Sequence, residues 1–474
     1  MSTATPTAAP ATSAKAETAF RIPATGAWQQ AWKVMAVFAL LGLVGAGAGF
    51  AIAPQRFAFS WLFGFMVALS LGLGAMFFVL VQFLTGSGWS VTVRRTGEFF
   101  LTGIFALPIL FIPIALSLDT LYPWIGHTGH GDHASAEHGG GGHGGGHGGS
   151  EHGDEHAAPH GEDAVGEDGV ARMGEDHMPI PDAAAWEGND AALHAQHAEI
   201  LAFKGWYLNM PFFTGRAIFY FLTWVFLAWR LFSWSTQQDK TRDIAITRKL
   251  QGLAPGAIAL FAITLTFSGF DWVMALEPTW YSTIYGVYLF AGAVVTIHAL
   301  VIVIGLGLKS QGYLGNAVTT EHFHDLGKMM FGFTVFWTYI GFSQFVLIWY
   351  ASIPEETTFY HLRWESAGWR AVSLSLVVGH FIVPFFMLIS RNAKRRLAIL
   401  GFGAGWMLVM HVIDVYWLVV PYAAPGFSPH WMDIACLFGI VGTFLSIVFW
   451  QMSRHSLVAI GDPRIGRAMR FHNA

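Results

Sequence analysis

The feature that most constrains the fold of this chain is a series of ten long apolar stretches. They lie at about residues 31–53, 58–84, 99–121, 206–229, 252–276, 281–308, 329–351, 370–390, 397–420 and 431–452. A helix needs roughly 20 apolar residues to cross the hydrocarbon core of a bilayer. Open strands are excluded there because their unpaired backbone groups would be too costly. We therefore predict an all-α integral membrane protein with ten transmembrane helices.

The composition agrees with lipid as the main solvent of this chain. Only 12% of its residues are charged, about half the share of roughly 25% that soluble domains carry. The single cysteine, Cys436, provides neither a disulfide framework nor the ligands of an iron–sulfur cluster or a covalently attached haem. We therefore expect no covalently bound cofactor, and any redox centre that works with this chain would belong to another chain.

The distribution of basic residues predicts the orientation. If the N-terminus is in the cytoplasm, twenty of the 26 Lys and Arg residues fall in cytoplasmic segments and five in outer segments, as the positive-inside rule requires. Both termini are then cytoplasmic. The predicted organisation is a disordered tail (1–27), spans one to three (28–121), a periplasmic loop (122–204), spans four to ten (205–453) and a basic tail (454–474).

The loop at 122–204 differs from the rest of the chain. It holds twelve of the 21 histidines and fifteen of the 30 acidic residues around a Gly-rich tract at 139–149. Such a segment buries too little apolar surface to fold alone. One hypothesis is a metal-collecting loop, because His-rich tracts bind divalent metals. A solvated spacer is favoured because no spacing recurs as a fixed ligand set, and we predict no metal site.

Ionisable side chains within the predicted spans are the functional candidates, because burying each costs roughly 2.5–3.5 kcal/mol on insertion scales. We expect Arg216 near the midplane or slightly outside it, the three histidines near the middle, and the acids toward the outer side. One hypothesis is a proton path along these groups. The structural alternative is that Arg216 pairs with an acid while the histidines bond to carbonyls; a bis-histidine haem site is disfavoured, and no catalytic residue is assigned. The candidates are Arg216, Asp271, Glu277, His298, His380, His411, Asp414 and Asp433.

A short internal similarity suggests a repeat. Asp271 and Asp414 lie near the outer ends of spans five and nine, and each is followed by a proline seven residues later, Pro278 and Pro421. This pattern favours two four-helix bundles, spans 2–5 and 6–9, with helices 1 and 10 flanking them.

Several segments resemble a known family. Together with 414–421, these are 207–213 (YLNMPFF), 270–278 (FDWVMALEP), 280–284 (WYSTI), 336–345 (FWTYIGFSQF) and 349–356 (WYASIPEE). The chain resembles the ActF-type membrane subunit of alternative complex III, a bacterial quinol:electron-carrier oxidoreductase. That subunit belongs to the NrfD-like, polysulfide-reductase membrane-subunit superfamily. The resemblance covers residues 200–455, and the earlier spans agree in layout.

The resemblance implies a place in the bacterial inner membrane and specific partners. These are a homologous quinol-oxidising NrfD-like subunit, an iron–sulfur protein and multihaem cytochrome c subunits, so haem and Fe–S centres lie on partners. The quinol would be menaquinol or ubiquinol. The family's proton-path role carries over to Arg216, Asp271, His298, His411 and Asp414 as candidates.

Two further expectations concern quinone and the rival functions. A quinone-facing surface would use Asp271 and Trp280, beside Glu277, because a quinol site needs an apolar slot with a proton acceptor. The rivals are a secondary transporter for divalent metal and a non-conducting scaffold. A transporter is disfavoured because no paired Gly/Pro interruptions surround the midplane charges.

Overall fold

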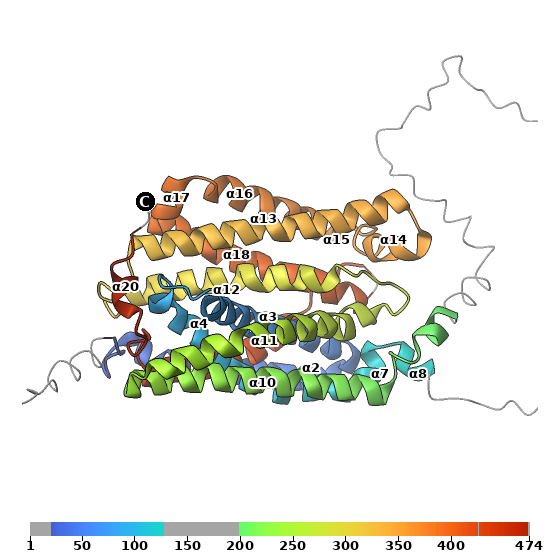
Figure 1. Ribbon diagram of the computed structural model, residues 1–474. Coiled ribbons are helices and arrows are strands. Elements are labelled where there is room, and N and C mark those ends of the chain that lie inside the picture. Colours follow the sequence, from blue (N-terminus) through green and yellow to red (C-terminus); the bar gives the residue numbers. More distant parts are fainter. Residues whose placement is uncertain (1–19, 128–198, 425, 473–474) are drawn as a thin grey trace, which may run out of the picture.

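The computed structural model describes residues 20–127, 199–424 and 426–472, and every regular element within them is a helix. Ten of the helices are long and apolar enough to cross a membrane, which confirms the predicted number. Figure 1 shows them packed side by side with their axes roughly aligned. The predictions for residues 1–19, and for the histidine-rich part of the loop at 128–198, concern residues outside this description.

The ten spans alternate in direction along the chain. In order they are α2 (Ala31–Ile52), α3 (Pro54–Leu84), α4 (Val91–Gly103) continued by α5 (Leu107–Leu110) and α6 (Ile112–Leu116), α10 (Met210–Thr241), α11 (Ile244–Trp272), α12 (Tyr285–Ser310), α13 (Thr320–Ala351), α15 (Ala367–Ser375) continued by α16 (Val383–Leu388), α18 (Leu397–Val419) and α19 (Trp431–Arg454). Short helices lie between some of them: α7 (Leu118–Leu121), α8 (Trp124–His127), α14 (Pro354–His361) and α17 (Arg391–Arg395). A further short helix, α20 (Ile465–Met469), follows the last span.

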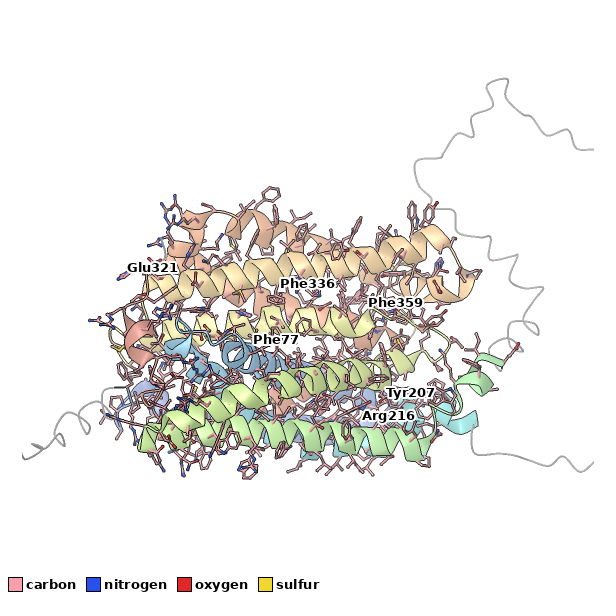
Figure 2. All side chains as sticks on the ribbon, in the orientation of Figure 1. Phe77, Tyr207, Arg216, Glu321, Phe336 and Phe359 are labelled. Carbon is pink, nitrogen blue, oxygen red and sulfur yellow. The ribbon has the colours of Figure 1, made fainter. Side chains whose placement is uncertain are left out.

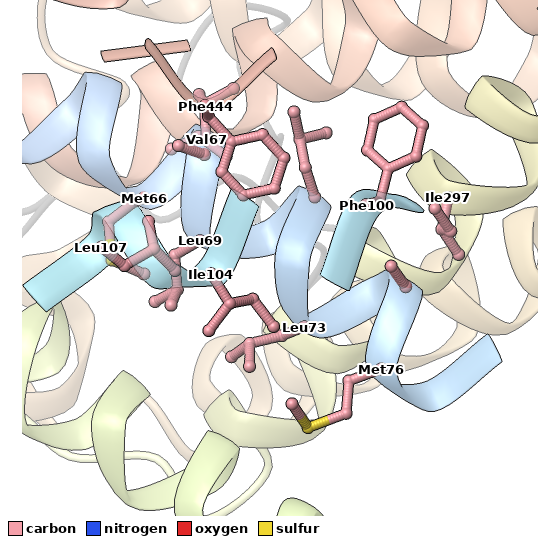
Figure 3. Close-up of a cluster of buried hydrophobic side chains, with 14 of the residues drawn as sticks. Met66, Val67, Leu69, Leu73, Met76, Phe100, Ile104, Leu107, Ile297 and Phe444 are labelled. Atoms are coloured by element: carbon pink, nitrogen blue, oxygen red, sulfur yellow. The ribbon is translucent and has the colours of Figure 1, made fainter. Parts of the chain in front are cut away.

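The spans form the two predicted bundles. Helices α3, α4–α6, α10 and α11 pack together as the first, and α12, α13, α15–α16 and α18 as the second. Helices α3 and α12 lie side by side where the bundles meet. Figure 3 shows part of the core around α3, where Met66, Leu69 and Leu73 meet Ile104 of span three. Helix α3 is buried along most of its length because neighbours from both bundles surround it.

The first and last spans pair with each other. Helix α19 packs along α2 and also against α3 and α4, so both outer helices accompany the first bundle. A Cβ atom added at Gly42 would lie only 2.2 Å from the backbone nitrogen of Gly439. Such small residues let two helix backbones approach closely in lipid.

The two ends of the molecule differ, and we name them by what they carry. The loop end carries α7, α8 and residues 199–209; the terminal end carries Phe20 and α20 (Figure 1). The Leu457 amide donates a hydrogen bond to the Phe20 carbonyl at 2.8 Å, which ties the two described chain ends together.

Helices α10 and α11 are longer at the terminal end than the predicted spans at 206–229 and 252–276. Only Arg242 and Asp243 separate them. Arg242 adopts a left-handed conformation with φ 53°, which ends α10, and Asp243 caps α11 by accepting from the Ala245 amide at 2.8 Å. Hydropathy identifies the lipid-crossing part of a helix, whereas polar helix-forming residues extend it past the lipid.

Two spans are interrupted. In span three a 3-10 turn, Ile104–Ala106, precedes Pro108 and Pro113, which have no amide proton to donate. In span eight a π-helical segment, Leu376–Ile382, separates α15 from α16. The expectation that no paired interruptions occur is only partly right. The interruptions exist, but they fall on the second span of one bundle and the third span of the other.

Candidate functional site

Asp414 lies inside the second bundle, on α18. It is eight residues before the loop-end limit of its span at Tyr422, or about 12 Å at 1.5 Å per residue. Its side chain is only 2% exposed. The Tyr288 hydroxyl, from α12, donates a hydrogen bond to Asp414 Oδ1. Among the ion pairs of the described residues, Asp414 has one basic neighbour, His411 at 4.0 Å, and no Lys or Arg.

His411 lies one turn before Asp414 and joins the two bundles. Its Nε2 is 2.8 Å from the hydroxyl of Ser70 on α3, and that hydroxyl donates to the Val67 carbonyl at 2.7 Å. Because a serine hydroxyl has one proton, Ser70 accepts from His411 Nε2–H. The neutral imidazole therefore keeps its free lone pair on Nδ1. This nitrogen is buried, has no hydrogen-bond partner in the described chain and lies 4.0 Å from Asp414 Oδ2.

A small cavity adjoins these side chains where the bundles meet. Its volume is about 30 Å³, enough for one or two waters at roughly 10–15 Å³ each, whereas small-molecule pockets measure roughly 300–1,000 Å³. The wall is mainly apolar, and its polar side chains are Ser70, Ser268, His411 and Asp414. We call Asp414, His411, Tyr288 and Ser70 the Asp414 cluster.

His380 lies near the middle of its span, as predicted, within the π-helical segment of span eight. Its ring stacks on Trp337 of α13 with 3.8 Å between centroids, and neither ring nitrogen has a hydrogen-bond partner in the described chain. π-Helical turns within α-helices are frequent at functional sites. His380 is thus a second buried imidazole with unused bonding capacity.

Arg216 and Asp271 form a closed ion pair in the first bundle. Arg216 donates from Nε and Nη2 to the two Asp271 oxygens at 2.9 and 2.8 Å, and the Tyr220 hydroxyl donates to Oδ2 at 2.7 Å. The guanidinium also lies 3.8 Å from the ring centroid of Tyr207, as Figure 2 indicates at the loop end. Arg216 thus pairs with an acid, an arrangement compatible with the structural alternative and with a proton path in which an arginine keeps a carboxyl group ionised.

Arg216 lies toward the loop end of α10. The helix begins at Met210, so Arg216 lies six residues from its start, about 9 Å at 1.5 Å per residue. The predicted depth of Arg216 relative to the lipid, near the midplane or slightly outside it, stays a prediction.

His298 lies in the middle of α12, as predicted. Its Nδ1 is 2.7 Å from the Val294 carbonyl, and its ring packs between Phe78 and Phe333 at 5.3 and 5.9 Å. The structural alternative, a histidine bonded to a carbonyl, describes this residue well.

The remaining predicted residues lie at the loop end with partners of their own. Glu277 accepts from the Tyr422 hydroxyl at 3.1 Å. Trp280 is buried, stacks on Phe359 and donates to the Glu356 carbonyl at 3.0 Å. The predicted role of Asp271 and Trp280 toward a quinone stays a prediction.

Asp433 ties α19 to α3. It accepts from Arg56 at 2.5 Å and from Ser60 at 2.6 Å, and it completes a capping box with His430 at the start of α19. These contacts give Asp433 a structural role between the two helices.

Two members of the Asp414 cluster and a buried charge network were not predicted from the sequence. Ser70 and Tyr288 are single polar residues in apolar runs, which carry no sequence signal by themselves. Arg94, Arg95 and Glu98 are fully buried and paired with one another at 2.7 and 3.3 Å. Their spacing of three and four residues, which places opposite charges on one helix face, was the signal available.

This network extends to the C-terminal segment at the terminal end. Asp462 accepts from Arg94 at 3.1 Å and from Arg464 at 2.7 Å. These cations and the Arg464 amide overcome the effect of burial and lower the pKa of Asp462 to about 2. Asp239 of α10 joins the network by accepting from Arg95 at 2.6 Å.

Comparison with known proteins adds no assignment. No protein-family model matches the chain, and no curated protein is significantly similar to it. Within the described part of the chain, no group of three or more His, Cys, Asp or Glu side chains could hold a metal ion.

Proposed function

We propose that this chain is a membrane subunit of a respiratory quinol:electron-carrier oxidoreductase, and that its Asp414 cluster takes up and releases protons within the membrane. The observation that carries the proposal is the difference between two buried carboxyl groups. Asp271 is neutralised by a bidentate arginine, whereas Asp414 has no Lys or Arg partner among the described ion pairs and lies beside an unpartnered imidazole nitrogen and a cavity.

The size and ligands of the site favour a proton over a metal ion. Zinc takes four ligands and magnesium six in near-octahedral geometry. The cavity of about 30 Å³ offers one imidazole nitrogen, one carboxyl group and two serine hydroxyls. A proton needs no coordination shell and can pass between a carboxyl group and an imidazole over a short distance. The divalent-metal transporter is therefore the weaker candidate at this site.

The size of the cavity also limits which molecules can bind beside Asp414. Because the cavity of about 30 Å³ has room for only one or two waters, a quinone ring does not fit beside Asp414. We therefore assign quinol oxidation to a partner subunit and proton handling to this chain, as the resemblance to alternative complex III implies. The iron–sulfur and haem centres would lie on the other partners.

The test is Asp414→Asn in the complete complex purified from native membranes and placed in proteoliposomes. The amide keeps the shape of the side chain but cannot exchange a proton. We expect the initial rate of proton-coupled quinol oxidation to fall at least about tenfold, against the roughly 10²–10⁴-fold rate contribution of positioned acid–base groups, while subunit composition stays unchanged. The matched control is Asp119→Asn, which alters an exposed carboxyl group on α7.

Two outcomes would count against the proposal. If Asp414→Asn releases protons as the wild type does, the chain has a scaffold role instead. If the chain purifies without haem proteins, it is not a subunit of a respiratory complex. Deleting residues 127–177 separates the remaining rival: we expect respiration to continue without a metal-dependent growth defect, whereas a transporter with a His-rich collecting loop would lose metal uptake.

A further inference from the structure

The space between His411 and Asp414 is the strongest unexplained feature of the site. Nδ1 of His411 and Oδ2 of Asp414 are 4.0 Å apart, too far for a direct hydrogen bond. Nδ1 is nevertheless buried and without a partner in the described chain. A buried acceptor left unsatisfied is destabilising, so this geometry needs a compensating group.

We infer that a water molecule binds between His411 Nδ1 and Asp414 Oδ2, and that Gly292 keeps the space for it open. This inference deepens the proposed function and rests on it for its role in proton transfer. A water accommodates the gap because it can bond to both atoms at about 2.8 Å, and buried waters typically have two to four polar partners. The cavity of about 30 Å³ includes both side chains and Gly292 in its wall.

Gly292 leaves this space open because it has no side chain. A Cβ atom at residue 292 would lie 3.3 Å from His411 Nδ1 and 3.5 Å from Asp414 Oδ2. It would also lie 3.2 Å from His411 Cε1, so a methyl group enters the same space with a shift of only a few tenths of an ångström. Gly292 is inside α12, where alanine is more favourable than glycine, so alanine removes the water's space without a backbone penalty.

The water completes a balanced proton transfer. The O–H bond of protonated Asp414 breaks and its proton passes to the water, while the water gives one of its own protons to His411 Nδ1. The products are the Asp414 carboxylate, the His411 imidazolium and an unchanged water. The Ser70 hydroxyl holds the imidazole in place through Nε2 at 2.8 Å, and Tyr288 holds the carboxyl group through Oδ1.

The experiment compares Gly292→Ala with Gly405→Ala in the complete complex. A Cβ atom at Gly405, on α18, meets nothing within 4 Å, so this control has the same chemistry without filling the cavity. A high-resolution map of the wild-type complex should show density for a water between His411 and Asp414. The map of Gly292→Ala should lack it while the fold and subunits remain.

The functional readout is the initial rate of quinol-driven proton release in proteoliposomes. We expect Gly292→Ala to lower it at least about tenfold, toward the range for losing a positioned proton-transfer group, and Gly405→Ala to match wild type. An empty gap in the wild-type map, or wild-type proton release in Gly292→Ala, overturns the inference. If Asp414→Asn has no effect although the water is present, the proposed function fails and the binding site stands.

Discussion

Asp271 and Asp414 occupy similar places in the two bundles but have different neighbours. Each lies on the last span of its bundle, seven residues before a proline. Asp271 receives three hydrogen bonds from Arg216 and Tyr220. In the second bundle the buried arginine is Arg363, which donates to the carbonyls of Trp417 and Leu418 at 2.9 Å rather than to Asp414. The first carboxyl group is thus neutralised by an arginine, whereas the second has no Lys or Arg partner among the described ion pairs.

Replacing Asp271 should therefore cost stability. In Asp271→Asn the Arg216 guanidinium stays buried without its counter-charge, and breaking a buried pair in this way costs roughly 3–5 kcal/mol. We expect that loss in the free energy of unfolding, measured by denaturant titration in detergent. The matched variant Asp414→Asn removes no ion pair to a Lys or Arg and should lose far less. Equal losses in the two variants would contradict the distinction between the two sites.

Only some residues of the site could be predicted from the sequence. Asp414, His411, Arg216 and Asp271 stand out because charged and imidazole groups are rare within apolar runs. Their pairing does not follow from the sequence, because it depends on which helices face one another. Tyr288 was not predicted for the same reason. A tyrosine within a span can be assigned to a site only when the structure shows that it contacts a carboxyl group.

At the scale of elements, the helices follow from hydropathy and their irregularities do not. The ten apolar runs predict ten spans because lipid enforces helical structure. The π-helical segment at His380 has no such signal, although Pro384 is near it. The extra residue of a π-helical turn depends instead on tertiary packing. Here His380 stacks on Trp337, and the Trp406 indole donates to the Gly379 carbonyl at 2.7 Å. The helix pairing of α2 with α19 likewise depends on contacts between distant segments.

The pairing of α2 with α19 gives a prediction at this scale. In Gly42→Ala the new Cβ would lie 2.2 Å from the Gly439 nitrogen and 2.7 Å from the Ala435 carbonyl oxygen, so the two backbones must separate. Overpacking of this kind costs roughly 1–3 kcal/mol. We expect a lower unfolding midpoint in detergent and faster proteolysis at Ala53, the single residue between α2 and α3. Gly47→Ala, on the same helix with nothing within 4 Å of its Cβ, should behave as wild type.

At the scale of the whole molecule, the two ends have different chemistry. The loop end carries Arg216 and Asp271, and the Asp414 cluster opens on the cavity between the bundles at greater depth. The terminal end is closed by the C-terminal segment, whose Gly461 amide donates to Asp239 at 3.1 Å and whose Asp462 reaches Arg94. Glu321 and Arg395 pair at this end of the second bundle (Figure 2). The positive-inside prediction counted Arg94 and Arg95 among the cytoplasmic residues, and the structure shows that both are fully buried.

The attachment of the C-terminal segment should depend on the charge of Asp462. Its pKa is lowered to about 2 by Arg464 and Arg94, from roughly 3.9 in an unfolded chain. A lowered folded-state pKa means that the stabilisation is complete above the unfolded value and is lost as pH falls from about 4 to about 2. We expect amide hydrogen exchange of residues 455–469, corrected for intrinsic rates, to stay slow from pH 7 to 5 and to accelerate below about pH 4.

Asp462→Asn should exchange fast already at pH 7, because Arg94 and Arg464 lose their shared carboxylate, and its exchange should not change across that acid window. Slow exchange in this variant at pH 7 would mean that apolar contacts of Val91, Ala459 and Ala468 hold the segment without the ion pairs.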